Sequence, residues 1–145
     1  MKILHALVLA LACGICGSAN AETGNPIMMQ TDDGSYFFSM PSKNMECTYT
    51  PAHYRGTYRT SDDLAEIQCD RAEPSYVRAT MGEELGPTII KNPGEQPCCS
   101  DGPEFAYDHT WKMGAFSCDS LRSGLVCTRN DGHGFRLSRA KAEVF

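Results

Sequence analysis

The chain has 145 residues, of which 41% are hydrophobic, and it contains 13 Gly, 8 Pro, 8 Cys and a single Trp. This length accommodates one small domain rather than two. Acids outnumber bases by 18 to 13, which disfavours a general role in nucleic-acid binding.

Residues 1–21 have the pattern of a secretory signal peptide. Lys2 precedes an apolar run over residues 3–16, and residues 19–21 (Ala-Asn-Ala) form a small-residue cleavage site. The apolar run is shorter than the about 20 residues that a spanning helix needs, and no later segment is long and apolar enough. We therefore expect a periplasmic or extracellular protein with no membrane span in the mature chain, whose 12 bases and 18 acids give a net charge of −6.

After the signal peptide, residues 22–35 are polar and contain glycine and proline, which predicts a flexible N-terminal tail. Residues 36–145 are predicted to form a single disulfide-stabilised, mostly β domain, either a small antiparallel sheet or a barrel-like structure. Residues 44–49 alternate in period two and place Met45, Cys47 and Tyr49 on one face. Further strands are predicted over residues 36–40, 64–69, 76–80 and 88–91.

The C-terminal part predicts a three-stranded meander. Residues 130–132 (Asn-Asp-Gly) are a strong tight-turn signal between strands over 125–129 and 135–137. A strand over 114–118 precedes them, joined through a turn over 119–124. The last residues, 139–145, are expected to form one or two helical turns with Ala140 and Val144 on one face.

Six cysteines follow the signal peptide, and an even number in a small exported domain indicates disulfides. In the hairpin predicted around residues 119–124, Cys118 and Cys127 share a face and can meet across the ladder, so we predict that they are bonded. Cys47–Cys69 is the second predicted pair.

The adjacent Cys98 and Cys99 leave two arrangements open. The pairing above would join them to each other, although neighbouring side chains normally point apart in extended chain. If instead they join two different elements, Cys47 and Cys69 are their partners. The chain after the signal peptide has no closely spaced cysteine pair of the C-x₂-C type, so we expect no zinc site and no cofactor.

Two segments resemble a known family. Residues 38–47 and residues 132–139 are similar to the F-x-x-P-S-G-N-x-x-C opening and the G-H-G-F-x-L-S-R closing of a group of small exported bacterial domains of unknown function. The likeness extends through Tyr107, residues 110–111, 114–118 and 124–127, while Lys43 stands where the family prefers Gly. The resemblance implies an exported, cysteine-bridged β domain and supplies no activity, ligand or catalytic residue.

Among candidate chemical residues, His133 lies between two glycines beside Asp131, with Arg139 nearby in sequence. A Ser/His/Asp arrangement is one reading, but there is no G-x-S-x-G motif to present a nucleophile. A structural turn residue is the stronger reading, and we name no catalytic residue. His53 and His109 could join His133 in a metal site only if the fold united them, and we predict none.

The segment around residues 53–61 is the preferred recognition site, because contact residues often lie on loops held by a rigid scaffold. It combines aromatic and basic side chains of the kind enriched at interfaces: Tyr54, Arg55, Tyr58 and Arg59. A second basic set could contact an anionic envelope polymer or pair with the acidic stretch over 62–104: Arg122, Arg129, Arg136, Arg139 and Lys141.

Together these features predict a non-catalytic binding or inhibitor-like module for a protein or envelope component. A small hydrolase or metal-dependent enzyme centred on His133, and a purely structural envelope protein, are the alternatives.

Overall fold

A computed structural model of the protein describes residues 29–32, 34–94 and 102–145. The predicted signal peptide, Cys98 and Cys99 lie outside these residues. The described chain forms eleven strands and no helix. They are β1 (Met29–Gln30), β2 (Tyr36–Ser39), β3 (Met45–Thr50), β4 (Glu66–Arg71), β5 (Val77–Gly82), β6 (Thr88–Lys91), β7 (His109–Met113), β8 (Phe116–Leu121), β9 (Gly124–Arg129), β10 (Gly134–Leu137) and β11 (Ala142–Val144).

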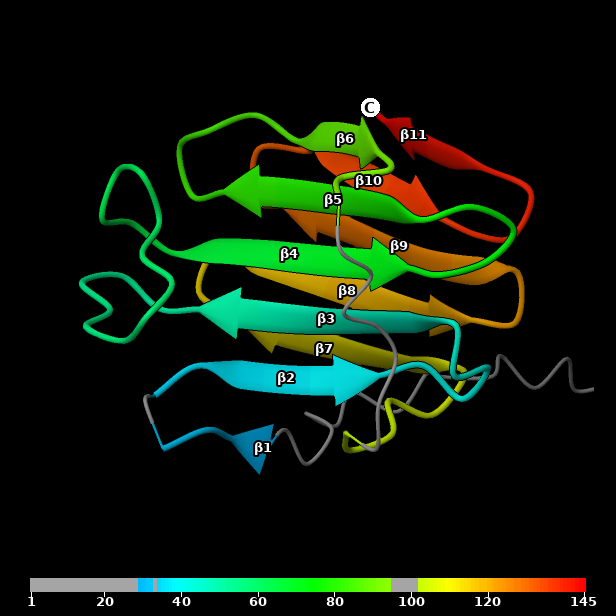
Figure 1. Cartoon of the computed structure of the whole chain (residues 1–145), viewed down its shortest axis with the longest axis horizontal. Helices are drawn as coiled ribbons and strands as arrows, with labels where there is room; N and C mark the ends of the chain where they lie inside the picture. Colours follow the sequence, from blue (N-terminus) through cyan, green and yellow to red (C-terminus); the bar gives the residue numbers. More distant parts are fainter. Residues whose placement is uncertain (1–28, 33, 95–101) are drawn as a thin grey trace, which may run out of the picture.

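The strands form two antiparallel sheets, each a meander in chain order. The first sheet has the order β1-β2-β3-β4-β5-β6 and the second the order β11-β10-β9-β8-β7. The sheets lie face to face, with the first in front of the second in Figure 1. The predicted mostly β, antiparallel fold is confirmed, and the predicted three-stranded meander is the β8-β9-β10 part of the second sheet.

Alternation of side chains along the strands forms the core between the sheets. Met45, Cys47 and Tyr49 of β3 are buried while the residues between them are partly exposed, as the period-two pattern predicts. From the second sheet, Trp111 and Phe116 are buried in the same cluster. The Tyr49 ring contacts both, with centroid distances of 5.8 Å to Trp111 and 6.1 Å to Phe116. These contacts join the two sheets through aromatic packing.

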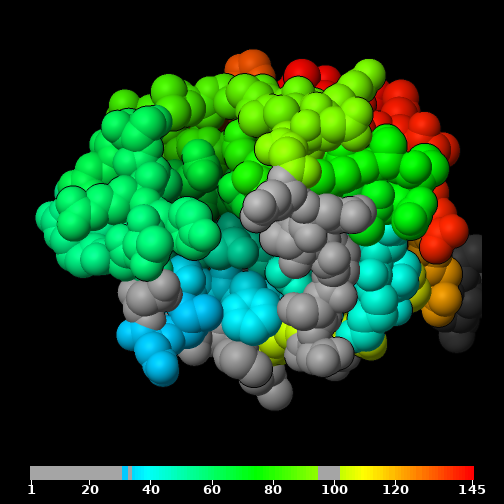
Figure 2. Space-filling view, viewed as in Figure 1, coloured from blue at the N-terminus to red at the C-terminus, as the bar shows by residue number. Residues whose placement is uncertain are grey.

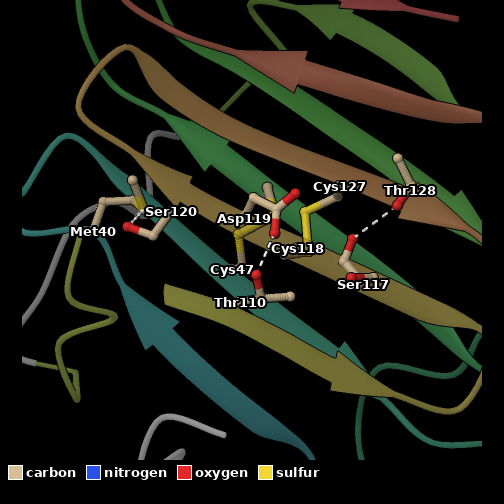
Figure 3. Close-up of a disulfide and its surroundings, with 10 residues drawn as sticks. Met40, Cys47, Thr110, Ser117, Cys118, Asp119, Ser120, Cys127 and Thr128 are labelled. Atoms are coloured by element: carbon tan, nitrogen blue, oxygen red, sulfur yellow. Dashed lines mark hydrogen bonds between the residues drawn. A yellow bond between two sulfur atoms is a disulfide. The ribbon is translucent and has the colours of Figure 1, made fainter. Parts of the chain in front are cut away.

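Each sheet carries one disulfide between directly opposite residues. Cys47 pairs with Cys69 across β3 and β4, and Cys118 pairs with Cys127 across β8 and β9, in each case with Cα atoms 4.1 Å apart. Both predicted pairs are therefore present. Figure 3 draws the Cys118–Cys127 bridge with Cys47 of the facing sheet, and all four cysteines belong to one core cluster.

Two predictions of local structure are wrong. Residues 139–145 form no helix: the chain turns at Ser138 and returns as β11, which pairs with β10. The spacing of Ala140 and Val144 fits a helix, but the open edge of β10 offers backbone hydrogen bonds that a short exposed helix cannot match. The predicted tail over 22–35 is also too long, because Met29–Gln30 pairs with β2; residues 22–28 lie outside the described part.

The turn between β8 and β9 is tighter than predicted. The strands extend through Leu121 and resume at Gly124, so that only Arg122 and Ser123 form the loop. Gly124 has a φ of +139°, and a Cβ there would clash with the carbonyl of Leu137. A glycine is therefore required for the close approach of this turn to β10.

Two arginines join the sheets at opposite ends of the sandwich. Arg71, at the end of β4, donates from Nη1 to the carbonyl of Ser138 at 2.6 Å, after β10. Arg129, at the end of β9, donates from Nη1 to the carbonyls of Gly82 and Leu85 at 2.8 and 2.9 Å. We call the end of the sandwich at Arg71 the cavity end; it is on the right of Figure 1. We call the end at Arg129 the loop end; it is on the left.

Candidate functional site

His133 lies in the exposed turn between β9 and β10, at the loop end. The neighbouring Asp131 carboxylate accepts hydrogen bonds from Arg129 Nε and Nη2 at 3.0 and 2.6 Å and from the backbone N–H of His133 at 3.2 Å. The imidazole of His133 has no hydrogen bond to the residues that the structure describes. A base in a catalytic triad is oriented by a carboxylate, and Asp131 is instead held by Arg129.

The hydrogen bonds from Arg129 lower the pKa of Asp131 from 3.8 to about 2, and the backbone N–H of His133 contributes to the same shift. Arg129 also donates to the carbonyls of Gly82 and Leu85. Its guanidinium is therefore held by contacts within the fold. Of the two alternatives for the basic set, contact with an anionic polymer or pairing within the fold, Arg129 follows the second, because its donors contact Asp131 and the backbone of the 62–104 stretch.

Arg139 and His133 are close in sequence but lie at opposite ends of the molecule. Arg139 is six positions after His133, and β10 runs extended between them, which places them roughly 20 Å apart. The structure therefore divides the predicted recognition residues between two sites. Arg139 belongs to the cavity end, while His133 shares the loop end with Tyr54, Arg55, Tyr58 and Arg59.

The connection between β3 and β4 is a fifteen-residue segment, 51–65, which we call the long loop. It forms a knob at one end of the molecule in Figure 2. Antiparallel neighbours are usually joined by two to five residues, and longer ordered loops are commonly functional. The length of this connection therefore distinguishes it from the other hairpin turns.

The base of the long loop is fastened by its own residues. His53 Nδ1 lies 2.9 Å from Asp63 Oδ2, and Arg55 Nη1 lies 3.5 Å from Asp63 Oδ1. The hydrogen bond with His53, followed by the positive charge of Arg55, lowers the pKa of Asp63 below its ordinary value. Thr60 Oγ1 donates to the carbonyl of Leu64 at 2.8 Å. These contacts close the loop on itself.

The tip of the long loop presents side chains to solvent. Tyr54 is buried against the backbone of Gly56, where a Cβ would clash with the tyrosine ring. Tyr58, in contrast, is 83% exposed, and Arg55 and Arg59 beside it are also exposed. An aromatic ring held in water by an ordered loop, with arginines beside it, has the composition of an interface anchor.

Asp70, on the outer face of the first sheet, forms hydrogen bonds with neighbouring side chains. The Asp70 carboxylate accepts hydrogen bonds from Tyr76, Arg78 and Gln68 at 2.9 to 3.0 Å. Burial, followed by the hydrogen bond to Asp70, raises the pKa of Tyr76. Because each polar group has a partner within the network, we interpret it as structural.

The cavity end contains an open cavity of about 330 Å³. Three connections and one aromatic side chain surround it: the β2–β3 turn, the β8–β9 turn, the loop after β10, and Tyr107. Its lining consists of Met40, Ser42, Asn44, Met45, Tyr107, Leu121, Arg122, Ser123, Gly124, Ser138, Arg139 and Ala140. This set includes no acidic residue.

Comparison of the chain with models of protein families, with curated proteins and with solved structures finds no match. The resemblance described above therefore stays a prediction. Among the described residues there is no helix long and apolar enough to cross a membrane, and no group of three or more His, Cys, Asp or Glu side chains placed to hold a metal ion.

Sequence reasoning missed the residues that fasten each site. Asp63 lies ten residues from His53, and Arg71 lies far along the chain from Ser138, so no local pattern signals either contact. A signal did exist for the cavity: Ser42, Asn44 and Arg139 lie in the two family-like segments, which the fold brings together at this end.

Proposed function

We propose that this protein is an exported, non-catalytic binding domain that recognises a protein or another envelope component through the long loop. The observation that carries the proposal is Tyr58, which is 83% exposed on a loop fastened at its base by Asp63. Ordering the loop before binding reduces the entropy lost on association, so an exposed aromatic anchor contributes more to affinity.

Export is supported by the N-terminal pattern and by the two core disulfides, which form and persist in oxidising compartments. The scaffold suits a binding module because the loop extends from a sandwich held by a bridge in each sheet. The bridged sheets restrict movement at the base of the loop, whereas its tip is free to contact a partner.

The test is affinity capture from an envelope extract with the purified protein as bait. We expect the wild-type protein to retain a partner in stoichiometric amount. Truncating a hot-spot tyrosine costs about 2 kcal/mol or more, so Tyr58→Ala should weaken the affinity for that partner about 30-fold. The dissociation constants are then measured by surface plasmon resonance with the captured partner.

Val144→Ala is the matched control, because Val144 is also an exposed apolar side chain, 46% exposed, in β11 and outside the long loop. It should bind as the wild type does. Thermal unfolding, followed by Trp111 fluorescence, establishes that both variants are folded. Absence of any stoichiometric partner, or equal binding by Tyr58→Ala and the wild type, would contradict the proposal.

A further inference from the structure

The cavity end has the features of a second site, independent of the long loop. Its volume of about 330 Å³ falls within the range of small-molecule sites. The walls are partly apolar, from Met40, Tyr107 and Leu121, and the ionisable groups that line it are Arg122 and Arg139 beside the phenol of Tyr107. Positive charge without an acidic counterpart in the lining favours an anionic occupant.

Arg139 is the central residue of this argument. It is exposed, it lines the cavity, and it makes no hydrogen bond or ion pair with the described part of the chain. Its neighbours differ: Lys141 Nζ lies 2.7 Å from Glu143 Oε2, and Arg136 Nη1 lies 3.8 Å from Glu143 Oε1. The fold therefore pairs the cations around Arg139 and leaves its five donors available.

Arg122 is oriented toward the same space by an aromatic ring. Its guanidinium carbon lies 5.2 Å from the centroid of Tyr107, in a cation–π contact that holds the side chain while leaving donors at its edge. Arg122 Nε lies 4.0 Å from Asp108 Oδ2, at the limit of an ion pair, and both side chains are largely exposed. Such a pair neutralises little charge.

Hydroxyl groups add neutral donors. Ser42 and Ser123 line the cavity, and their hydroxyls have no hydrogen bond to the described residues, whereas Ser138 Oγ is already bonded to the backbone of Lys141. Two guanidinium groups and two hydroxyls supply more hydrogen-bond donors than the two oxygens of a carboxylate can accept well. A phosphate group, with three acceptor oxygens, matches this set of donors better.

The backbone around the cavity is fixed before any ligand arrives. Arg71 holds the carbonyl of Ser138 at 2.6 Å, and Asn44 exchanges two side-chain hydrogen bonds with the backbone of Glu73, at 2.7 and 2.9 Å. The turn at Gly124 is in close contact with β10. A fixed frame with uncommitted donors is the arrangement that binds an anion at low entropic cost.

We propose that this cavity binds a ligand bearing a phosphate group, with Arg139 and Arg122 on the phosphate, Ser42 and Ser123 as neutral donors, and the adjoining part of the ligand against Tyr107 and Leu121. The phosphate belongs either to a small soluble ester or to a lipid headgroup.

The test is titration of the isotopically labelled protein, with its disulfides intact, followed by NMR at constant ionic strength. The soluble probes are inorganic phosphate, glycerol 3-phosphate and acetate. We expect saturable shifts of the amides of Ser123, Gly124 and Ala140 with both phosphate probes, and weaker binding of acetate. Arg139→Gln should weaken phosphate binding at least tenfold, and Arg139→Lys should restore part of it, because lysine keeps the charge without the fork of donors.

A second arm distinguishes the source of the phosphate. Vesicles of phosphatidylglycerol are compared with vesicles of phosphatidylcholine in co-sedimentation with wild type and Arg139→Gln. Arginine-dependent binding to the anionic vesicles identifies a lipid headgroup, and binding confined to the soluble phosphate probes identifies a soluble ester; either result supports the site. Lys91→Gln, which removes an exposed cation on β6, is the charge-matched control and should bind as the wild type does.

No saturable binding of any phosphate probe or vesicle would overturn the proposal. Equal binding by Arg139→Gln and wild type, or acetate binding as tight as that of phosphate, would do the same. Because the long loop lies at the opposite end of the sandwich, these outcomes are independent of the capture experiment with Tyr58→Ala.

Discussion

The guanidinium of Arg71 donates from Nη1 to the carbonyl oxygen of Ser138 over 2.6 Å, which ties the end of β4 to the loop after β10. Arg71 is only 4% exposed, and burial lowers the pKa of its guanidinium, which stays protonated at neutral pH. Its Nη2 donates to the carbonyl of Ser75 at 3.2 Å. A buried arginine thus uses backbone carbonyls from both sheets as its partners.

Replacing Arg71 by Met should lower the free energy of unfolding by about 2 kcal/mol, because the hydrogen bonds of a charged group to the partly buried carbonyls of Ser138 and Ser75 are lost. Urea unfolding followed by Trp111 fluorescence measures it. Arg136→Met, at an exposed site paired with Glu143, should change stability by less than about 0.5 kcal/mol. Equal effects of the two substitutions would show that Arg71 does not join the sheets.

Removing the disulfide that closes the longer loop should lower the free energy of unfolding more than removing the other disulfide. Cys47–Cys69 spans a sequence separation of 22, and Cys118–Cys127 spans 9. The chain-entropy estimate assigns about 3.4 kcal/mol to the first and about 2.7 kcal/mol to the second. Double Cys→Ala variants of each pair, compared by urea unfolding, check this order. A larger loss on removing Cys118–Cys127 would mean that native packing, rather than the unfolded chain, determines the difference.

The contact between Asp131 and Arg129 should make stability depend on acid pH. The pKa of Asp131 in the folded protein is about 2, below its ordinary 3.8, so the folded state binds this proton less readily than the unfolded state does. The contribution of Asp131 is present above about pH 4 and is lost as the pH falls toward 2. Unfolding measured between pH 6 and 2 should show that Asp131→Asn is less stable than the wild type at pH 6. The difference should shrink toward pH 2, and a constant difference would contradict this linkage.

Lys43 occupies a backbone conformation that favours glycine. Its φ is +53°, in the left-handed region, and its ion pair with Glu104 is exposed, with 3.9 Å between the charged atoms. The left-handed conformation costs an ordinary residue about 1 to 2 kcal/mol, and glycine avoids this cost. Glycine also makes the unfolded chain more flexible, which offsets part of the stabilisation. Lys43→Gly should therefore raise the free energy of unfolding by about 0.5 to 1 kcal/mol. Lys43→Ala, which keeps the Cβ and removes the charge, should not raise the free energy of unfolding. If it raised stability as much as Lys43→Gly does, the effect would be due to the charge and not to the backbone conformation.

Local patterns in the sequence were sufficient for much of the fold. Alternation placed Met45, Cys47 and Tyr49 on one buried face, and the Asn-Asp-Gly turn at 130–132 set the hairpin of β9 and β10. The pairing of Cys118 with Cys127 followed from the hairpin alone, because the two residues face each other across adjacent strands. Such features depend on contacts between residues near in the chain, where side-chain periodicity and turn geometry decide the result.

What the sequence by itself determined was the class of the protein: a small, acidic, bridged β domain with export features. Only the tertiary structure decided that 142–144 forms an edge strand, that Arg129 is used within the fold, and that Arg139 and His133 lie at opposite ends of β10. It also decided that Ser42 and Arg139 line one cavity. These outcomes depend on which sheet edges are open and which carbonyls lie within reach of a guanidinium. The contacts of Arg129 and the lining of the cavity join residues far apart in the chain. The pairing of 142–144 with β10 is local, but it depends on competition between a short helix and an open sheet edge, which the residue pattern alone does not decide.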